Sequence, residues 1–466
     1  MRRRKGWLRR IGYAVTALLA GAAACHLPPP KPVLVYVPAS VIVDPYSSSG
    51  GGSKIVSGAK TFWQAMSLLD TGYTSKHTST PDQIAFSHAL GLVMSGQQDE
   101  AELALDSIGG STGDSLMRAT SRVLLTTMLQ YQDKWNILAD LAGGKKRDSI
   151  DLEDVNKADV ESWASAFKHV KRRVVSFSNG PVTLPLLISA SGTPMVAVNV
   201  NGKEKIFWLD TGSSMTIISS DVADECAINA LVPDTLEVAT TTGHVAARPA
   251  AVDRIRLGGI EILNSTAMIV ASNVMQVRVG DANNPVSVIG IDGVIGFDIM
   301  SRMDIRIDYV NRRVTFLKPE LVKGRAAALG RNLFWVGTPI VRLVSDRGTP
   351  LYFNLDTGAQ ETYSTEGLVT KTKTRTFAGE RRLVGGLAGL QIVLGRFIDE
   401  MRMSMAGQRL LFRKMLVYAP AVSTFVPLDG VLGSDVGKSG TVRIDATNGL
   451  FLLESQQHDE GLKIRS

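Results

Sequence analysis

One stretch of this sequence occurs twice, and this internal repeat limits the fold more than any other feature. The first copy pairs Gly192–Pro194 with Phe207–Gly212, and the second pairs Gly337–Pro339 with Phe353–Gly358. The distance from the proline to the aspartate is nearly the same in the two copies. Short β-type runs separated by Gly and Asn turns surround both copies. We therefore expect two related, β-rich halves in one chain.

The repeat continues downstream, where two further pairs of segments share one offset. Asp292–Gly296 reappears as Asp429–Gly433, and Arg306–Asp308 reappears as Arg443–Asp445. These matches place the two halves at 180–325 and 326–456.

A further pair, Leu257-Gly258 and Leu394-Gly395, is matched on spacing, because Gly258 precedes Gly296 by the same distance as Gly395 precedes Gly433. This matching leaves extra residues in the first half, between Asp-Thr-Gly and Leu-Gly. We interpret them as a longer hairpin in that half, since hairpin loops tolerate insertions.

These motifs resemble aspartic proteases, in which two apolar-apolar-Asp-Thr-Gly segments are each followed by an apolar-apolar-Gly segment. The short halves look like retropepsins, whereas their placement in one chain is as in the pepsin-like enzymes. The resemblance covers about residues 180–455 and implies an all-β, bilobal domain that hydrolyses polypeptides without a cofactor or metal. It also implies that a monomer contains a complete site.

The resemblance assigns roles to residues of both loops. It implies that Asp210 and Asp356 are the catalytic pair, that Thr211 and Thr357 grip one loop to the other, and that Gly212 and Gly358 complete the loops. Ser213 matches the residue found after this glycine in pepsin-like enzymes, and Ala359 matches the retroviral one. Two adjacent carboxylates share a proton, because both do not ionise easily side by side. One can then act as general base on water and the other as general acid on the scissile carbonyl.

Asp-Thr-Gly also forms ordinary turns, and the chain has a third copy at Asp70-Thr71-Gly72. This copy follows a helical run and has no partner motif at the right spacing. We therefore interpret it as a helix end, with Gly72 near the position just after the helix.

In the aspartic proteases that these motifs resemble, a hairpin that follows each Asp-Thr-Gly covers the substrate. The first candidate for this flap is Thr240–Val245, with Gly243 at its tip, and the second is Phe377–Glu380, with Gly379 at its tip. Neither tip contains Tyr, unlike the pepsin-like flap. The alternative is that both are surface hairpins.

Residues 57–175 show helical periodicity. We expect helices at about 81–95 and 99–107 and a third that Asp114 caps. A domain of this kind would bind a protein partner or serve as a spacer.

The same region contains a short internal match of its own. Leu90, Met94 and Gln98-Asp99 recur as Leu124, Met128 and Gln132-Asp133. The offset resembles the period of a tetratricopeptide array, which is about 34 residues. A small helical bundle is the alternative.

Residues 1–25 are typical of a secretory leader, with six basic residues before an apolar core. The end of this leader, Ala22-Ala23-Ala24-Cys25, resembles a bacterial lipobox, so Cys25 is the expected lipidation site; plain cleavage after Ala24 is the alternative. Residues 26–56, rich in Pro, Gly and Ser, are expected to be a tether. This arrangement predicts a periplasm-facing envelope protein anchored through Cys25, at the outer rather than the inner membrane.

Charge and cysteine content exclude other classes. Removing the six basic residues of the leader from the net charge of +7 leaves +1, so the sequence does not predict nucleic-acid binding. The scattered His residues do not suggest a metal site, and Cys226 is expected to be a small buried residue. We therefore expect an aspartic endopeptidase of the bacterial envelope; the alternatives are an inactive protease-fold lipoprotein that binds peptides and acts through the helical domain, or a scaffold lipoprotein using only the helical repeats.

Overall fold

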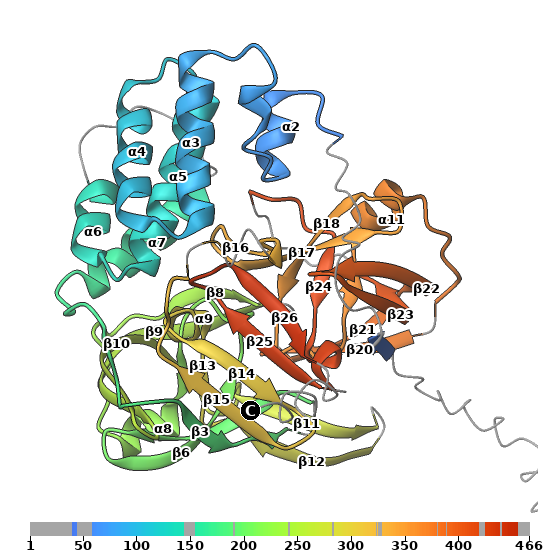
Figure 1. The fold of residues 1–466 in the computed structure, drawn as a ribbon. Coiled ribbons are helices and arrows are strands. Elements are labelled where there is room, and N and C mark those ends of the chain that lie inside the picture. The colour runs from blue at the N-terminus through green and yellow to red at the C-terminus, as the bar shows by residue number, and fades with distance from the viewer. Residues whose placement is uncertain are drawn as a thin grey trace, which may run out of the picture. The chain divides into compact units, whose positions relative to one another are not determined.

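A computed structural model of the chain divides into two units, and every described residue belongs to the second, Pro38–Ser466. Within that unit a helical region precedes two β lobes, as the sequence predicted (Figure 1). The structure describes residues 40–43, 58–143, 154–189, 192–240, 243–281, 284–322, 324, 329–379, 381–387, 389–418, 425–438 and 440–454.

Capping side chains begin helices in the helical region, and the cap that the sequence predicted at Asp114 is one of them. Thr80 accepts from the backbone N–H of Gln83, whose side chain accepts from the N–H of Thr80. The side chain of Asp114 accepts from the N–H of Met117 at 3.0 Å. The elements are α2 (Phe62–Ser67), η1 (Tyr73–Ser75), α3 (Pro81–Ser95), α4 (Gln98–Ser111), α5 (Ser115–Tyr131), α6 (Trp135–Gly143) and α7 (Asp154–Phe167). Consecutive helices from α3 to α7 pack against one another, an arrangement that a helical bundle and a repeat array share.

The third Asp-Thr-Gly does follow a helix, but the predicted role of Gly72 is wrong. The left-handed residue after α2 is Leu69, with φ of 53°, whereas Gly72 has φ of −74° and precedes η1. Leu69 is buried, so packing holds a leucine in a conformation that usually favours glycine.

The first lobe is built on a sheet with the order β2-β10-β7-β13-β6-β5-β9-β8. Its strands are β2 (Val174–Phe177), β4 (Leu187–Ile188), β5 (Pro194–Val200), β6 (Lys203–Leu209), β7 (Ile217–Ser219), β8 (Leu236–Thr240), β9 (Gly243–Leu257), β10 (Ile260–Val270) and β13 (Gly293–Ile295). Two short helices and a separate hairpin complete it: α8 (Ser220–Glu225), α9 (Phe297–Met300), β11 (Gln276–Asp281) and β12 (Asn284–Gly290).

The second lobe repeats this plan with the order β1-β23-β19-β24-β18-β17-β16, and β22 also pairs with β17 and β23. Its strands are β1 (Ser40–Val43), β16 (Leu333–Trp335), β17 (Pro339–Ser345), β18 (Pro350–Leu355), β19 (Tyr363–Ser364), β22 (Arg396–Met405), β23 (Gln408–Val417) and β24 (Gly430–Leu432). It also contains α11 (Glu366–Thr372), η2 (Ser434–Gly437) and the hairpin of β20 (Arg381–Gly386) and β21 (Gly389–Leu394).

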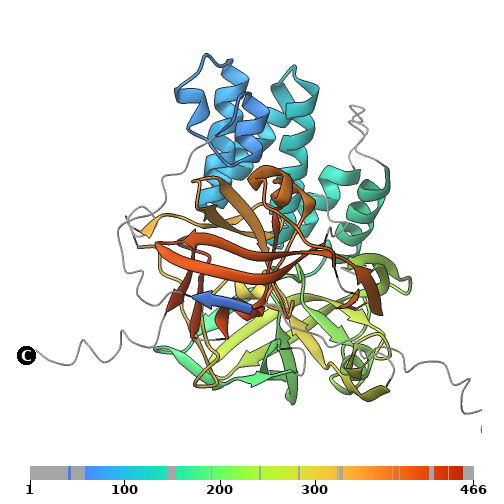
Figure 2. The same cartoon turned by 90° about the vertical axis from the view of Figure 1, so that its right-hand side faces the viewer.

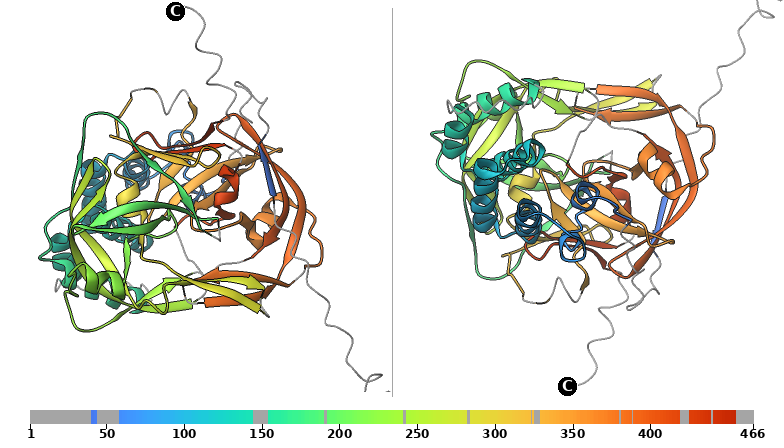
Figure 3. Two further views of the ribbon diagram at one scale, coloured as in Figure 1. Left: turned by 90° about the horizontal axis from the view of Figure 1, so that it is seen from below. Right: turned by 90° about the horizontal axis from the view of Figure 1, so that it is seen from above.

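A five-stranded sheet joins the lobes in the order β26-β25-β14-β15-β3. In its centre Arg306 of β14 lies directly opposite Arg443 of β25. These two residues are equivalent in the repeat, so the pseudo-two-fold axis passes between them. The lobes lie on opposite sides of the views in Figure 3. The strands are β3 (Val182–Pro185), β14 (Asp304–Asp308), β15 (Arg313–Leu317), β25 (Thr441–Asp445) and β26 (Leu450–Glu454).

The predicted tether contains one strand that the sequence analysis missed. β1 pairs antiparallel with β23, with Ser40 opposite Arg413 and Val43 opposite Leu410 (Figure 2). The run Ser-Val-Ile-Val is rich in β-branched residues, which favour strands. It adds to the edge of the second lobe, because β23 leaves that edge unpaired.

The predicted match of Leu257-Gly258 with Leu394-Gly395 is wrong. Gly258 lies in the turn that joins β9 to β10. Gly395 instead lies between β21 and β22, the two strands that together correspond to β9. The structural counterpart of Gly258 is the turn at Ala406-Gly407, which joins β22 to β23. The extra residues of the first lobe therefore lie after β10, in the β11–β12 hairpin, and the equal spacing was coincidental.

Candidate active site

The two Asp-Thr-Gly loops begin where the central strands β6 and β18 end. The backbone N–H of Asp210 donates to the carbonyl of Ile295 at 3.1 Å, and that of Asp356 donates to Leu432 at 3.0 Å. Ile295 and Leu432 belong to β13 and β24, which run parallel to β6 and β18. The apolar-apolar-Gly segments thus support each aspartate from behind, in the place that the sequence predicted for them.

Thr211 and Thr357 hold the loops together through four reciprocal hydrogen bonds. The N–H of Thr211 donates to Thr357 Oγ1 at 3.0 Å, and the N–H of Thr357 donates to Thr211 Oγ1 at 3.0 Å. Each hydroxyl then donates to the other lobe, Thr211 to the carbonyl of Leu355 at 2.8 Å and Thr357 to that of Leu209 at 2.7 Å. Both threonines are buried, so their places in the loop match the cross-loop grip that the sequence predicted.

The two aspartates meet across the pseudo-two-fold axis. A Cβ built on Gly212 would lie 2.5 Å from Asp356 Cγ, and one built on Gly358 would lie 2.5 Å from Asp210 Cγ. Each carboxylate also accepts a backbone N–H from its own loop, Asp210 Oδ1 from Gly212 at 2.8 Å and Asp356 Oδ1 from Ala359 at 2.9 Å. Glycine is therefore required in both loops because the opposite carboxylate occupies the space of a side chain.

Electrostatics favour a shared proton on this pair. Burial raises the pKa of Asp210, and the hydrogen bonds that it accepts from the loop oppose the shift. Burial raises the pKa of Asp356 well above its ordinary value, and the neighbouring charge of Asp210 raises it further. The two carboxyls also hydrogen-bond to each other. These effects favour a pair in which one carboxyl is ionised and the other is protonated.

Ser213 and Gly243, the predicted flap glycine of the first lobe, lie in different parts of the site. Ser213 closes the turn, because its N–H donates to the carbonyl of Asp210 at 3.3 Å and its hydroxyl donates to Met215 at 2.7 Å. Gly243 begins β9 and lies opposite Thr240, at the predicted end of the β8–β9 hairpin.

Gly379 is not the tip of a hairpin, contrary to the prediction. The hairpin of the second lobe turns between Gly386 and Gly389, which face each other at its end. A Cβ on Gly379 would lie 0.9 Å from the carbonyl oxygen of Gly395, so this glycine permits a close backbone approach. The prediction placed the tip at Gly379, whereas the hairpin turns at the glycines that follow it in the sequence.

A pair of buried aspartates behind the loops escaped the sequence analysis. Thr216 Oγ1 donates to Asp298 Oδ1 at 3.0 Å, and Thr362 Oγ1 donates to Asp435 Oδ1 at 2.7 Å. Burial raises the pKa of both carboxyls. Both follow the apolar-apolar-Gly motifs by two positions, so the repeat itself contained the signal.

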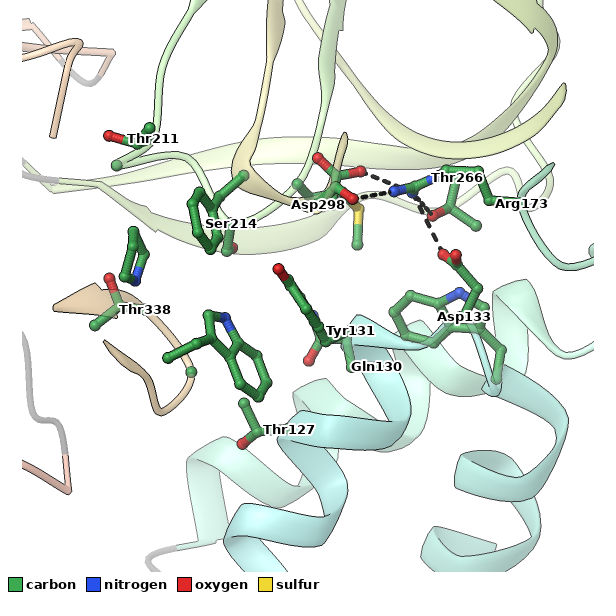
Figure 4. A pocket seen from close by; sticks show the side chains of 17 residues that line it. Thr127, Gln130, Tyr131, Asp133, Arg173, Thr211, Ser214, Thr266, Asp298 and Thr338 are labelled. Carbon is green, nitrogen blue, oxygen red and sulfur yellow. Dashed lines mark hydrogen bonds and ion pairs between the residues drawn. The ribbon is translucent and has the colours of Figure 1, made fainter. Parts of the chain in front are cut away.

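Asp298 has a further partner that connects it to the helical region. Arg173 donates to Asp298 Oδ2 at 2.7 Å and lies 3.3 Å from Asp133, the residue two positions beyond α5 (Figure 4). The side chain of Arg173 is 2% exposed. The internal match of the helical region includes Asp133, but nothing local in the sequence indicates its contact with Arg173.

Cys226 is buried and free, as predicted, and Cys25 lies outside the described residues. Among the described residues, no three His, Cys, Asp or Glu side chains come together to hold a metal ion. No helix in the described part of the chain is long and apolar enough to span a membrane.

Comparisons with known proteins place one protein family on the first lobe. Residues 196–302 match the family described as gag-polyprotein putative aspartyl protease. The chain is similar to a retropepsin-like aspartic protease from Rickettsia conorii, with 17% identity and a TM-score of 0.20 over 31% of this chain and 92% of that chain. It is also similar to an aspartic proteinase from Irpex lacteus, with 13% identity and a TM-score of 0.35 over 59% of this chain and 98% of that chain. No curated protein matches the sequence. The matched family segment carries Asp210 and its supporting strands. The family match therefore concerns the first of the two β lobes that follow the helical region.

Proposed function

We propose that the protein is an aspartic endopeptidase that hydrolyses polypeptides with water held between Asp210 and Asp356. The observation that carries this proposal is the contact of each loop glycine with the carboxylate of the opposite lobe. Because that contact brings the two carboxyls together, one chain supplies both the general base and the general acid.

The reaction follows from the shared proton. The ionised carboxyl accepts a proton from water while the oxygen of that water attacks the carbonyl carbon of the peptide bond. The protonated carboxyl donates its proton to the carbonyl oxygen, which gives a neutral tetrahedral diol. The carboxyl that is now protonated gives its proton to the amide nitrogen, and a hydroxyl of the diol gives its proton to the ionised carboxyl as the C–N bond breaks. The products are a carboxylic acid and an amine, and the pair is again singly protonated. Thr211 and Thr357 keep the two carboxyls in register through these steps.

We further propose that the protein acts in the bacterial envelope, facing the periplasm. The support is the leader-like sequence of residues 1–25 and the lipobox-like position of Cys25. A tetratricopeptide character of the helical region, and its binding of a protein partner, also remain proposals that rest on the internal match within that region.

The alternative is an inactive protease-fold protein that binds peptides and acts through the helical region. It has one observation in its favour: Thr127, Gln130 and Tyr131 of α5 line a cavity together with Gly212 and Ser214 of the active-site loop. Contacts between α5 and the active-site loop are consistent with a regulatory role of the helical region as well as with catalysis.

Hydrolysis separates the two functions. The purified protein is incubated with a denatured protein between pH 3 and 8, with and without a pepstatin-type inhibitor. New peptide ends that form at acidic pH and disappear with the inhibitor support the endopeptidase. Peptide binding without any cleavage across the pH range would favour the alternative.

A further inference from the structure

The pseudo-two-fold axis gives the cleft two equivalent ends, and one of them is lined by the lobes. At this end the Gly192–Pro194 segment lies beside Gly358, since Thr193 Oγ1 donates to the carbonyl of Gly358 at 3.2 Å. The atoms nearest to a Cβ built on Gly192 belong to Gln360, Ser434 and Lys438, each at 3.8 Å. These three residues all belong to the second lobe, so the nearest neighbours of this position come from a lobe and not from the helical region.

The opposite end differs, because helix α5 lies against it. Here the equivalent Gly337–Pro339 segment and Gly212 line one cavity. A Cβ on Gly337 would lie 3.1 Å from Thr127 Cγ2 of α5. The ring of Tyr131, the last residue of α5, stacks on Trp335 with centroids 4.2 Å apart. The helical region therefore supplies a wall at this end.

The space left at this end is small and chemically mixed. The cavity measures about 120 Å³, somewhat less than the roughly 150 Å³ of an engineered cavity that binds benzene. Tyr131, Trp335 and Phe297 give it aromatic sides. Trp135 Nε1 and Arg173 Nε, on residues that line it, are buried without a hydrogen-bond partner among the described residues. Figure 4 shows Tyr131, Thr127 and Gln130 on the helical side, facing Ser214 and Thr338.

The wall is fixed to the first lobe by buried ionic contacts. Arg173 joins Asp133 to Asp298, and Arg302 donates to the carbonyl of Tyr131 at 2.6 Å. The guanidinium of Arg302 also lies 5.6 Å from the centroid of the Tyr131 ring. The end of α5 is therefore held against the active-site loop rather than resting loosely on it.

We propose that α5 closes this end of the cleft, so that the protein cuts polypeptides close to one chain terminus. A peptide lying across the two aspartates meets the Gly358 loop on one side and the Gly212 loop on the other. Because the cavity on the Gly212 side has room for about one side chain, we expect a bound peptide to end about two residues past the aspartates on this side. The last side chain occupies the cavity, against Tyr131 and Trp335. This inference rests on the proposed peptidase function and specifies the substrates of the same site.

Peptides of graded length test the closed end. A cleavable core is extended stepwise on its amino side only, or on its carboxyl side only, and kcat/KM is measured for each with the full-length protein. We expect one series to be cut equally well at every length and the other to lose at least tenfold beyond about two residues. The series that loses rate identifies the terminus that the cavity holds. Equal tolerance of both extensions would overturn the proposal.

Binding separates this proposal from the proposed activity. The same labelled peptides are titrated onto the Asp356→Asn variant, and Kd is measured by fluorescence anisotropy. One-sided dependence of Kd on length, with no cleavage by the wild type, would retain the closed end and reject the peptidase. Binding that does not depend on the length of either side, or no binding of any peptide, would reject the closed end.

A matched pair of variants on α5 completes the test. Thr127 and Thr120 lie two turns apart, and each hydroxyl donates to the carbonyl four positions earlier, at 2.7 and 2.8 Å. Thr127→Trp fills the cavity and should lower kcat/KM at least tenfold for the preferred short-ended peptide. Thr120→Trp changes the same residue type outside the cavity and should leave it unaltered. Equal effects of the two variants would contradict a role for the cavity.

Discussion

Gly212→Ala places a methyl group where the structure leaves no room for one. The new Cβ would lie 2.5 Å from Asp356 Cγ and 2.6 and 2.8 Å from its two oxygens. Ordinary contact begins at 3.4 Å, so the carboxyl of Asp356 must move by about 0.9 Å. A displacement of about 1 Å in a catalytic group costs on the order of a hundredfold in rate, or about 2.7 kcal/mol in the activation barrier.

We therefore expect Gly212→Ala to lower kcat/KM about a hundredfold with a folded protein. Gly358→Ala should cause a similar loss, because its Cβ meets Asp210 Cγ at the same 2.5 Å. Gly110→Ala is the control: it lies in α4, and nothing lies within 4 Å of its Cβ. The assay is cleavage of a quenched peptide at acidic pH, with thermal unfolding of each variant. Wild-type activity in either loop variant would refute the cross-lobe contact as the reason for these glycines.

Three further changes probe the supports of the site. Thr211→Val should lower the free energy of unfolding by about 1–3 kcal/mol, because it leaves the N–H of Thr357 buried without its acceptor; Thr211→Ser keeps the hydroxyl and should restore stability in denaturant titrations. Arg173→Met should cost about 3–5 kcal/mol, since it leaves Asp298 and Asp133 buried without their cation; the exposed Arg254→Met should cost less than about 1 kcal/mol in the same titrations. Cys25→Ser should abolish palmitate labelling of the protein in cells and release it from the membrane fraction; labelling that persists would exclude a lipid anchor at Cys25.

The repeat made the meeting of Asp210 and Asp356 predictable from the sequence. Asp210 and Asp356 occupy equivalent places in two copies of one structural unit, and equivalent residues close to a pseudo-two-fold axis meet across it. The cross-loop bonds of Thr211 and Thr357 follow from the same symmetry. Asp298 and Asp435 could have been found in this way too, because they also recur at one offset.

The errors arose where sequence spacing replaced topology. Gly395 was matched with Gly258 by spacing, and Gly379 was assigned to a hairpin tip by its position. Glycine occurs both in turns and at close backbone contacts, and only the strand pairing distinguishes the two. β1 was missed because four β-branched and small residues within a Pro/Gly/Ser-rich segment give little signal without the edge of β23.

The contact between the helical region and the first lobe could not be predicted at all. Arg173, Asp133 and Asp298 lie far apart in the chain, and none of them belongs to a repeat shared by the helical and β regions. Their pairing depends on how the helical region packs against the first lobe. The periodicity of hydrophobic residues within each region carries no information about that packing.

The pH dependence of activity and stability in the aspartate variants tests the central claim most directly. The pKa of each carboxyl is raised in the folded protein, so the stability present below the ordinary aspartate pKa of about 3.9 is lost as pH rises through the folded values. Asparagine does not ionise, so Asp210→Asn and Asp356→Asn should each become more stable relative to wild type over that interval.

The measurement is kcat/KM and the melting temperature from pH 3 to 8 for wild type, Asp210→Asn, Asp356→Asn and the Asp70→Asn control. We expect wild-type activity to fall as pH rises far enough to ionise both carboxyls, no turnover in either site variant, and full activity in Asp70→Asn. Full activity in Asp210→Asn or Asp356→Asn would contradict a shared-proton pair, as would an activity loss confined to Asp70→Asn.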